Sequence, residues 1–161
     1  MLPRGPVCFV GTHRLDAMDH LLDQLSHNTT VVAFADAESV LETNAAAIRS
    51  NVDPPRSVIT LRGTPTDWTL FNKLMFNGMQ YRVDFWVAEH NHHFRAAQRQ
   101  NFTAVVIAGD IADMNRVWDG YMSLIKLSRS AFKASLRPNG YTVFQRGHFP
   151  KYCTFDDDVR R

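Results

Sequence analysis

The sequence predicts an α/β domain built on an open, mostly parallel sheet of about six strands, with helices on both faces. Short apolar runs alternate with longer segments of helical periodicity, which is typical of strands joined by helical crossovers. Several of these runs are apolar at every position, as expected of strands that are covered on both sides. Of the 161 residues, 45% are hydrophobic and 21% are charged, so the composition is that of a chain that buries a core.

The first half of the chain contains three predicted strands, at residues 7–10, 31–35 and 58–61. The first strand is closed by Gly11-Thr12, and apolar residues then recur at helical spacing from about 15 to 25. The second strand ends at Asp36 and precedes a predicted helix at 38–49. Pro54-Pro55 forces a loop before the third strand.

The second half contains three more predicted strands, at 83–88, 104–108 and 141–144. Segments of helical periodicity precede each of them, at about 66–75, 92–100 and 114–135. The segment 114–135 is predicted to be one long helix, which Arg137-Pro138-Asn139-Gly140 stops. Residues 1–161 are therefore expected to form a single domain with its core at about 7–146 and a C-terminal tail at about 150–161.

Charge and composition exclude few partners. The net charge is only +2, which neither requires nor excludes a nucleic acid. No apolar run approaches the roughly 18 residues of a membrane span, and the first residues lack the apolar stretch of a signal peptide. We therefore expect a cytoplasmic protein that does not enter a membrane, and the oligomeric state stays open. Cys8 lies inside an apolar run and is expected to be a buried free thiol.

The carboxyl ends of the strands hold the candidate site residues, because open parallel sheets bind ligands there. The residues at those ends that carry suitable chemistry are Gly11, Thr12, Asp36, Asp67, Glu89 and Asp110. Asp36 could accept both ribose hydroxyls of a nucleoside, or it could cap the following helix. Asp67 could hold an adenine amino group, or it could be an acidic residue in the first turn of the next helix.

The order of these features resembles that of class I S-adenosylmethionine-dependent methyltransferases. The resemblance rests on an apolar strand followed by Gly11, a strand followed by Asp36, and a strand followed by Arg62-Gly63-Thr64. It rests also on a long helix that ends in Leu136-Arg137-Pro138-Asn139-Gly140 before an apolar strand. The family's first loop usually carries two or three glycines, whereas this loop has Gly11 alone.

The resemblance implies a Rossmann-like fold and a methyltransferase-like domain whose methyl acceptor is a nucleic acid such as RNA, or a protein. It implies that S-adenosylmethionine is the cofactor, bound by Gly11, Thr12, Asp36 and Asp67. It places Asp110 or Glu89 near the transferred methyl as the catalytic residue. The single glycine of the first loop favours an alternative, a Rossmann-like binding or interaction module without catalysis.

A metal-dependent hydrolase is the third alternative. Gly109-Asp110-Ile111-Ala112-Asp113 resembles the Gly-Asp-x-x-Asp element of metallophosphoesterases, in which paired carboxylates bridge metal ions. Glu89-His90-Asn91-His92-His93 is the densest group of metal-ligand residue types, although adjacent residues seldom face one ion. Asp113 could instead cap the helix that follows it.

Two further patterns bear on nucleic acids and nucleotides. Basic residues recur after the fourth predicted strand, at Arg95, Arg99, Lys126, Arg129, Lys133, Arg137 and Arg146. They could form an RNA-binding surface or simply the solvated face of helices. The phosphate-binding pattern Gly-x-x-x-x-Gly-Lys-Ser/Thr is missing from the sequence.

Overall fold

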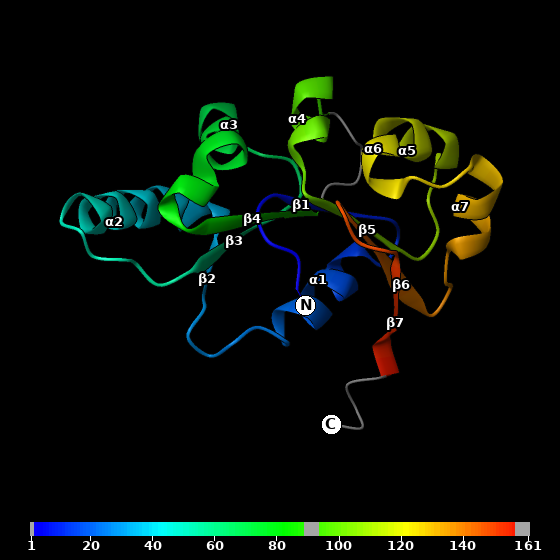
Figure 1. The fold of residues 1–161 in the computed structure, drawn as a ribbon, viewed down its shortest axis with the longest axis horizontal. Helices are drawn as coiled ribbons and strands as arrows, with labels where there is room; N and C mark the ends of the chain where they lie inside the picture. Colours follow the sequence, from blue (N-terminus) through cyan, green and yellow to red (C-terminus); the bar gives the residue numbers. More distant parts are fainter. Residues whose placement is uncertain (1, 89–93, 157–161) are drawn as a thin grey trace.

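The structure, a computed structural model, describes residues 2–88 and 94–156. Its strands form one seven-stranded sheet in the order β2-β3-β4-β1-β5-β6-β7 (Figure 1). Their bounds are β1 Val7–Val10, β2 Thr30–Ala33, β3 Ser57–Arg62, β4 Val83–Ala88, β5 Ala104–Ala108, β6 Gly140–Gln145 and β7 Lys151–Thr154. Strands β1 to β5 are parallel, whereas β6 and β7 pair antiparallel at one end of the sheet. The predicted open, mostly parallel α/β sheet is therefore confirmed.

Helices cover both faces of this sheet. Their bounds are α1 Arg14–Leu22, α2 Ala37–Arg49, α3 Trp68–Asn77, α4 Ala96–Asn101, α5 Met114–Gly120, α6 Met122–Ile125 and α7 Arg129–Ser135, with 3-10 turns η1 Phe34–Asp36 and η2 Gly78–Tyr81. Helix α1 lies on one face, below the sheet in Figure 1, and α2 to α7 lie on the other. No helix in the described ranges is long and apolar enough to cross a membrane.

The strand order corrects the Rossmann-like prediction. In a Rossmann sheet, of order 3-2-1-4-5-6, the first two strands are neighbours. Here β1 lies between β4 and β5, and β2 is the outermost strand. The alternation of apolar runs and helices does not distinguish these orders, because it reports which segments are strands and not which strands pair.

The segment 114–135, predicted as one helix, is three short helices. Helix α5 ends at Gly120, and Lys126 after α6 has a left-handed backbone with φ of 52°, which stops a helix. Ser128 then caps α7, its hydroxyl accepting a hydrogen bond from the amide of Ala131 at 3.2 Å. The indole of Trp118 in α5 donates to the carbonyl of Leu127 at 2.8 Å and so ties α5 to the turn before α7.

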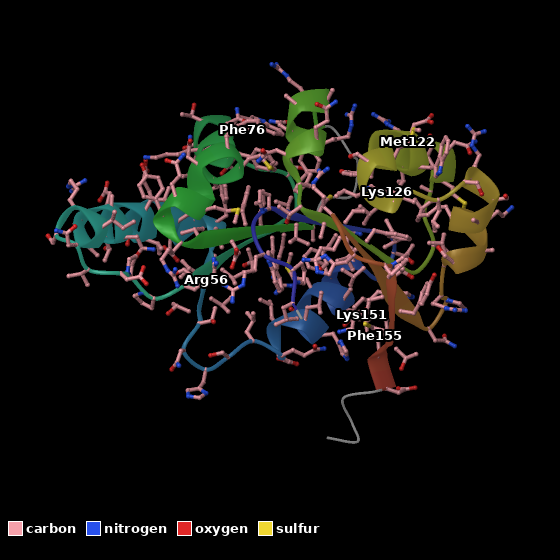
Figure 2. The ribbon with its side chains drawn as sticks, in the orientation of Figure 1. Arg56, Phe76, Met122, Lys126, Lys151 and Phe155 are labelled. Carbon is pink, nitrogen blue, oxygen red and sulfur yellow. The ribbon has the colours of Figure 1, made fainter. Side chains whose placement is uncertain are left out.

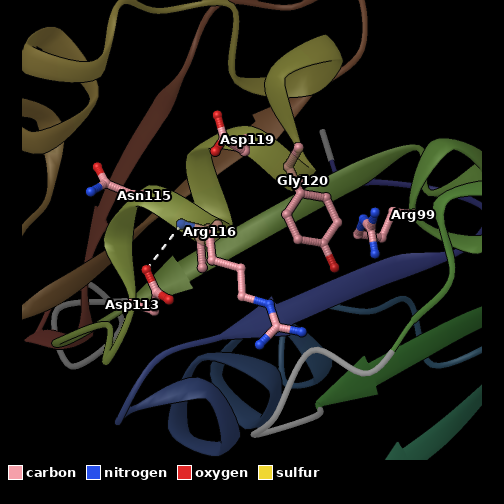
Figure 3. A pocket seen from close by; sticks show the side chains of 8 residues that line it. Arg99, Asp113, Asn115, Arg116, Asp119 and Gly120 are labelled. Atoms are coloured by element: carbon pink, nitrogen blue, oxygen red, sulfur yellow. Dashed lines mark hydrogen bonds between the residues drawn. The ribbon is translucent and has the colours of Figure 1, made fainter.

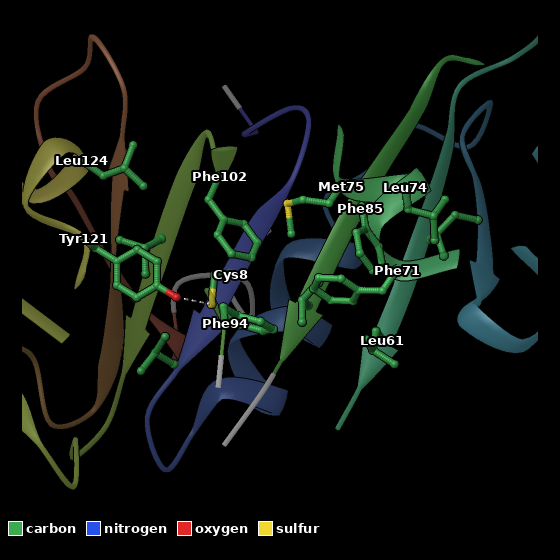
Figure 4. Packing of buried hydrophobic residues seen from close by; sticks show 14 of the residues in the cluster. Cys8, Leu61, Phe71, Leu74, Met75, Phe85, Phe94, Phe102, Tyr121 and Leu124 are labelled. Carbon is green, nitrogen blue, oxygen red and sulfur yellow. Dashed lines mark hydrogen bonds between the residues drawn. The ribbon is translucent and has the colours of Figure 1, made fainter. Parts of the chain in front are cut away.

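Strand alternation divides the core into two layers, one on each face of the sheet. Val7 and Phe9 of β1 belong to the layer beneath α1, whereas Cys8 and Val10 belong to the larger layer beneath α2 to α7. Figure 4 shows part of the larger layer. Cys8 is fully buried, as predicted, and its Sγ lies 3.4 Å from the hydroxyl of Tyr121.

Candidate functional site

The predicted site residues are distributed along the whole carboxyl edge of the sheet. Gly11 and Thr12 follow β1, and Asp110 follows β5, so these three residues lie at the ends of two neighbouring strands. Asp36 follows β2, three strand positions from β1, which is roughly 14 Å at a spacing of about 4.8 Å per strand. Asp67 follows β3, and Glu89 lies outside the described residues.

The turn between β1 and α1 is closed onto the turn after β5. The amide of Thr12 donates to the carbonyl of Asp110 at 2.9 Å, and the amide of His13 donates to the carbonyl of Ala108 at 3.0 Å. In return, the amide of Asp110 donates to the hydroxyl of Thr12 at 3.0 Å. A phosphate-binding loop uses amides at this position of the fold to hold its ligand. Here protein oxygens already accept from them.

Gly11 is what permits this contact between the two turns. Its φ is +110°, and a Cβ at this position would lie 2.1 Å from the carbonyl oxygen of Ala108. The glycine therefore serves the close approach of β1 to β5, and no second glycine opens the loop. From the sequence, Gly11 was expected to let a cofactor approach the backbone closely. In the structure it is the neighbouring strand β5 that approaches it.

The carboxylates at this edge divide into helix caps and exposed side chains. Asp67 accepts a hydrogen bond from the amide of Leu70 at 3.1 Å and caps α3. Asp113 accepts from the amide of Arg116 at 3.1 Å and caps α5, the alternative that the sequence left open. Asp36 stands at the N-cap position of α2 without a side-chain capping bond.

A cavity of about 490 Å³ lies between α4 and α5 (Figure 3). Arg99 and Arg116 bring two guanidinium groups to it, and Asp113 and Asp119 bring two carboxylates. Arg99 lies across Gly120, whose missing side chain leaves room for it, and donates to the carbonyl of Phe94. The cavity thus has one anchored and one exposed arginine.

A second cavity, of about 450 Å³, lies on the other side of α4, against α3. Trp68 and Phe76 of α3 line it and are 42% and 46% exposed. Arg95 adds a cation at the N-terminus of α4. Gln98 joins the two helices, because its amide nitrogen donates to Asn72 at 2.8 Å. Helix α4 is therefore flanked by one cavity that two arginines and two aspartates line and by another that holds two exposed aromatic rings.

Sequence reasoning found part of this surface. Arg95 and Arg99 belong to the predicted basic set, whereas Trp68, Phe76 and Arg116 were missed. The spacing of Trp68, Asn72 and Phe76, each four residues apart, places them on one side of α3 and was a usable signal. No group of three metal-ligand side chains occurs within 2–88 and 94–156, and the predicted histidine cluster at 89–93 lies outside these ranges.

Comparison with known proteins gives the class of fold, which is that of nucleoside triphosphatases (NTPases). No family model and no curated protein matches the sequence. Among solved structures, the genome-packaging NTPase B204 from Sulfolobus turreted icosahedral virus 2, in complex with AMP, superposes with a TM-score of 0.63. The sequences are 8% identical, and the match covers 94% of this chain and 98% of that chain.

Two further structures support this assignment of the fold. B204 in complex with ATP-gammaS gives a TM-score of 0.61 at 7% identity, covering 94% of this chain and 97% of that one. EssC (ATPases 2 and 3) from Geobacillus thermodenitrificans gives 0.63 at 6% identity, covering 96% of this chain but only 40% of that one. At such identities the likeness establishes an NTPase-like fold.

These findings overturn the methyltransferase prediction. The structural neighbours are NTPases and not methyltransferases, and some of them hold adenine nucleotides or their analogues rather than S-adenosylmethionine. The strand order gives the physical reason, because it separates Asp36 from Gly11 by β3 and β4. The observed fold also differs from those of the two alternatives, the Rossmann-like binding module and the metallophosphoesterase-like hydrolase.

Proposed function

We propose that the protein is a non-hydrolysing NTPase-fold domain that binds a single strand of nucleic acid across α4. The closed turn between β1 and α1 carries the first part of this proposal. The amides of Thr12 and His13 are bonded to the β5 turn, and no lysine stands in the turn Gly11-Thr12-His13. A triphosphate would find neither the free amides nor the lysine that hold its phosphates in a phosphate-binding loop.

The two cavities beside α4 support the second part. Single strands are bound by grooves that combine cations for the phosphates with aromatic side chains on which bases stack. Arg95, Arg99 and Arg116 supply the cations, and Trp68 and Phe76 supply exposed rings on the same face of the sheet. Figure 2 shows Phe76 on that face.

Charge is concentrated on this side of the molecule. Residues 95–137 contain seven basic and three acidic side chains, a net of +4, whereas the whole chain has a net charge of only +2. Most of this excess lies in α4, α5 and α7 and in the turns beside them. The remainder of the chain is therefore net acidic, which would orient a polyanion toward α4.

Fluorescence anisotropy with a labelled oligouridine longer than about 16 nucleotides tests the binding. We expect saturable binding that weakens as salt rises from about 50 to 200 mM. The double substitution Arg99→Ala, Arg116→Ala should weaken binding and lower the salt slope by about 2, one for each lost phosphate contact. Trp68→Ala should remove roughly 1–3 kcal/mol of stacking.

Arg62→Ala is the matched control. Arg62 is also an exposed arginine at the carboxyl edge, but it pairs with Asp19 of α1 on the opposite face, at 2.6 Å. Its loss should leave the affinity unchanged. Absence of binding at low salt, or an equal effect of Arg62→Ala, would contradict the proposed interface.

Phosphate release from ATP and Mg²⁺ tests the absence of hydrolysis, with and without the oligonucleotide. We expect the rate of a protein-free blank in both conditions. Turnover above the blank that persists through repeated purification would contradict the proposed absence of hydrolysis.

A further inference from the structure

A separate cavity lies at the amino edge of the sheet, on the face that carries α1 and opposite to the surface proposed above. Its volume is about 270 Å³. Apolar and polar residues both line it. The apolar ones are Leu2, Pro3 and Leu25, and the polar or amphipathic ones are Arg4, Gln24, Ser26, Thr29, Arg56, Asp84 and Trp86. Trp86 projects from β4 onto the α1 face, and Asp84, two residues earlier on the same strand, faces the same side. Arg56, which is labelled in Figure 2, precedes β3.

Two buried donors at this cavity have no acceptor. Trp86 is only 1% exposed, yet its indole Nε1 has no hydrogen-bond partner in the described part of the chain. The Nε of Arg56 is likewise buried and without a partner there. Buried N–H groups are almost always bonded, so two of them at one cavity indicate an acceptor supplied from outside the chain.

The geometry of Arg56 leaves one edge of its guanidinium for a ligand. Both hydrogen bonds that Arg56 donates to Asp84 come from Nη1, at 3.2 Å each. The Nε–Nη2 edge is thereby not engaged by Asp84, and this edge is one of those that receive a carboxylate through two parallel bonds.

Asp84 itself is not the missing acceptor. Its carboxylate is 3% exposed and accepts from the amide of Gly5 at 2.6 Å as well as from Arg56. Arg4 and Arg82 also act on it electrostatically, and Arg82 pairs with Asp53 at 3.3 Å. Among the described residues no carboxylate then remains to pair with Arg4, which also lines the cavity, and this favours an anionic ligand.

We propose that this cavity binds a small organic carboxylate. The Nε edge of Arg56 and the indole N–H of Trp86 donate to the ligand oxygens, while Leu2, Pro3 and Leu25 contact a short apolar tail. A volume of about 270 Å³ corresponds to roughly nine water molecules, enough for an acid of four to six carbons. The apolar wall favours such an acid over inorganic phosphate, which has no apolar part.

Proton–nitrogen correlation NMR of the indole groups tests this proposal with butyrate as the probe. The chain has three tryptophans, so two of them serve as internal controls. We expect the Trp86 indole resonance to move saturably, with a dissociation constant on the order of 1 mM. Trp118 already donates to Leu127, and Trp68 lies on the other face, so both indole resonances should stay in place.

Matched ligands and one conservative variant sharpen the test. Butyramide has the shape of butyrate without its charge and should bind at least ten-fold more weakly. Arg56→Lys keeps the charge but removes the planar edge, and should also weaken butyrate at least ten-fold while the spectrum stays that of a folded protein.

Three results would overturn the proposal. An unmoved Trp86 resonance at high butyrate concentration would mean that water alone fills the cavity. Equal binding of butyramide would show that the site does not recognise charge. An equal Trp86 shift with inorganic phosphate would make it a general anion site rather than a carboxylate site.

Discussion

The two edges of the sheet differ in how their polar groups are hydrogen-bonded. At the carboxyl edge, the turn after β1 and the turn after β5 bond to one another through Thr12, His13 and Asp110. At the amino edge, the buried N–H groups of Trp86 and Arg56 have no acceptor in the described chain. The backbone amides at the edge where the fold usually holds a ligand are thus bonded within the chain, although the buried Nε of Arg14 beside them has no partner among the described residues. At the amino edge, two such buried donors meet at one cavity.

This difference shows that a fold fixes where strands end but not where a ligand is needed. The hydrogen-bonding state of the backbone at each edge is the more direct indicator, because a buried donor without an acceptor is costly wherever it occurs. Substitutions at each edge test this difference.

The largest effect is expected for Gly11→Ala at the carboxyl edge. The added Cβ would lie 2.1 Å from the carbonyl oxygen of Ala108, so β1 and β5 would have to separate. We expect a loss of at least about 4 kcal/mol in the free energy of unfolding, measured by urea denaturation. Gly63→Ala is the control, because Gly63 also has a positive φ, +119°, but no atom lies within 4 Å of its Cβ position. It should cost only about 1–3 kcal/mol of backbone strain.

At the amino edge, Asp84→Ala should remove roughly 3 kcal/mol of stability, because it leaves the partly buried guanidinium of Arg56 without its carboxylate. Asp84→Asn should cost less, since the amide oxygen can still accept from Gly5. Asp53→Ala, which breaks the exposed pair with Arg82, should cost less than about 0.5 kcal/mol. Equal losses for Asp84→Ala and Asp53→Ala in urea denaturation would mean that burial gives the amino-edge pair no special weight.

The pKa of Asp84 gives a second test of its burial at the amino edge. Burial raises the pKa of Asp84 above its ordinary value of 3.8, although Gly5 and the neighbouring arginines oppose the shift. A raised native pKa means that the folded state binds this proton more tightly than the unfolded state. The group's contribution to stability is thus present below pH 3.8 and lost as the pH rises through the native pKa. Carbon NMR should show the Asp84 carboxyl titrating above 3.8, and a midpoint below that value would contradict the assignment.

A smaller effect is expected for Tyr121→Phe between the two edges. Its hydroxyl lies 3.4 Å from Cys8 Sγ in the core, and losing the contact should cost about 1 kcal/mol. Burial, with a contribution from Cys8, raises the pKa of Tyr121 well above 10. The unfolded chain therefore loses this proton first, and wild-type stability should fall as the pH rises above 10, more steeply than in the variant. Parallel alkaline profiles of unfolding free energy would show that Tyr121 ionises as readily in the native state.

The smallest difference in stability is expected between alanine variants of two aspartates at the carboxyl edge. Asp67 caps α3 through Leu70, whereas Asp36 stands at the start of α2 without a capping bond. Asp67→Ala should cost about 1 kcal/mol and Asp36→Ala less than about 0.5 kcal/mol. Thermal denaturation of the two variants checks this, and a larger loss for Asp36→Ala would reveal a role that its contacts do not show.

The sequence predicted the sheet well and its strand order poorly. Apolar runs such as 104–108 mark buried strands because local composition decides burial. Pairing β1 with β4 and β5, by contrast, joins segments far apart in the chain, and no local pattern records it. The same limit explains why Gly11 and Asp36 were grouped into one cofactor site although two strands lie between theirs.

The amino-edge cavity was missed for a different reason. The candidate site residues were all expected at the carboxyl ends of strands. Asp84, which follows Val83 at the start of β4, was therefore not among them. A carboxylate inside an otherwise apolar strand requires a buried partner, so Val83-Asp84-Phe85-Trp86 itself contains a signal of buried polar contacts. The partner, Arg56, could not be chosen from the sequence, because many arginines are available.

The central place of β1 has a consequence for how the chain folds. Cys8 pairs with Val87 on one side and with Val105 on the other, so the middle of the sheet closes loops of about 80 to 100 residues. Such long-range pairing slows folding relative to proteins whose contacts are local. During synthesis the strand made first must therefore wait for β4 and β5, and until they emerge its apolar residues stay available to chaperones or to other chains.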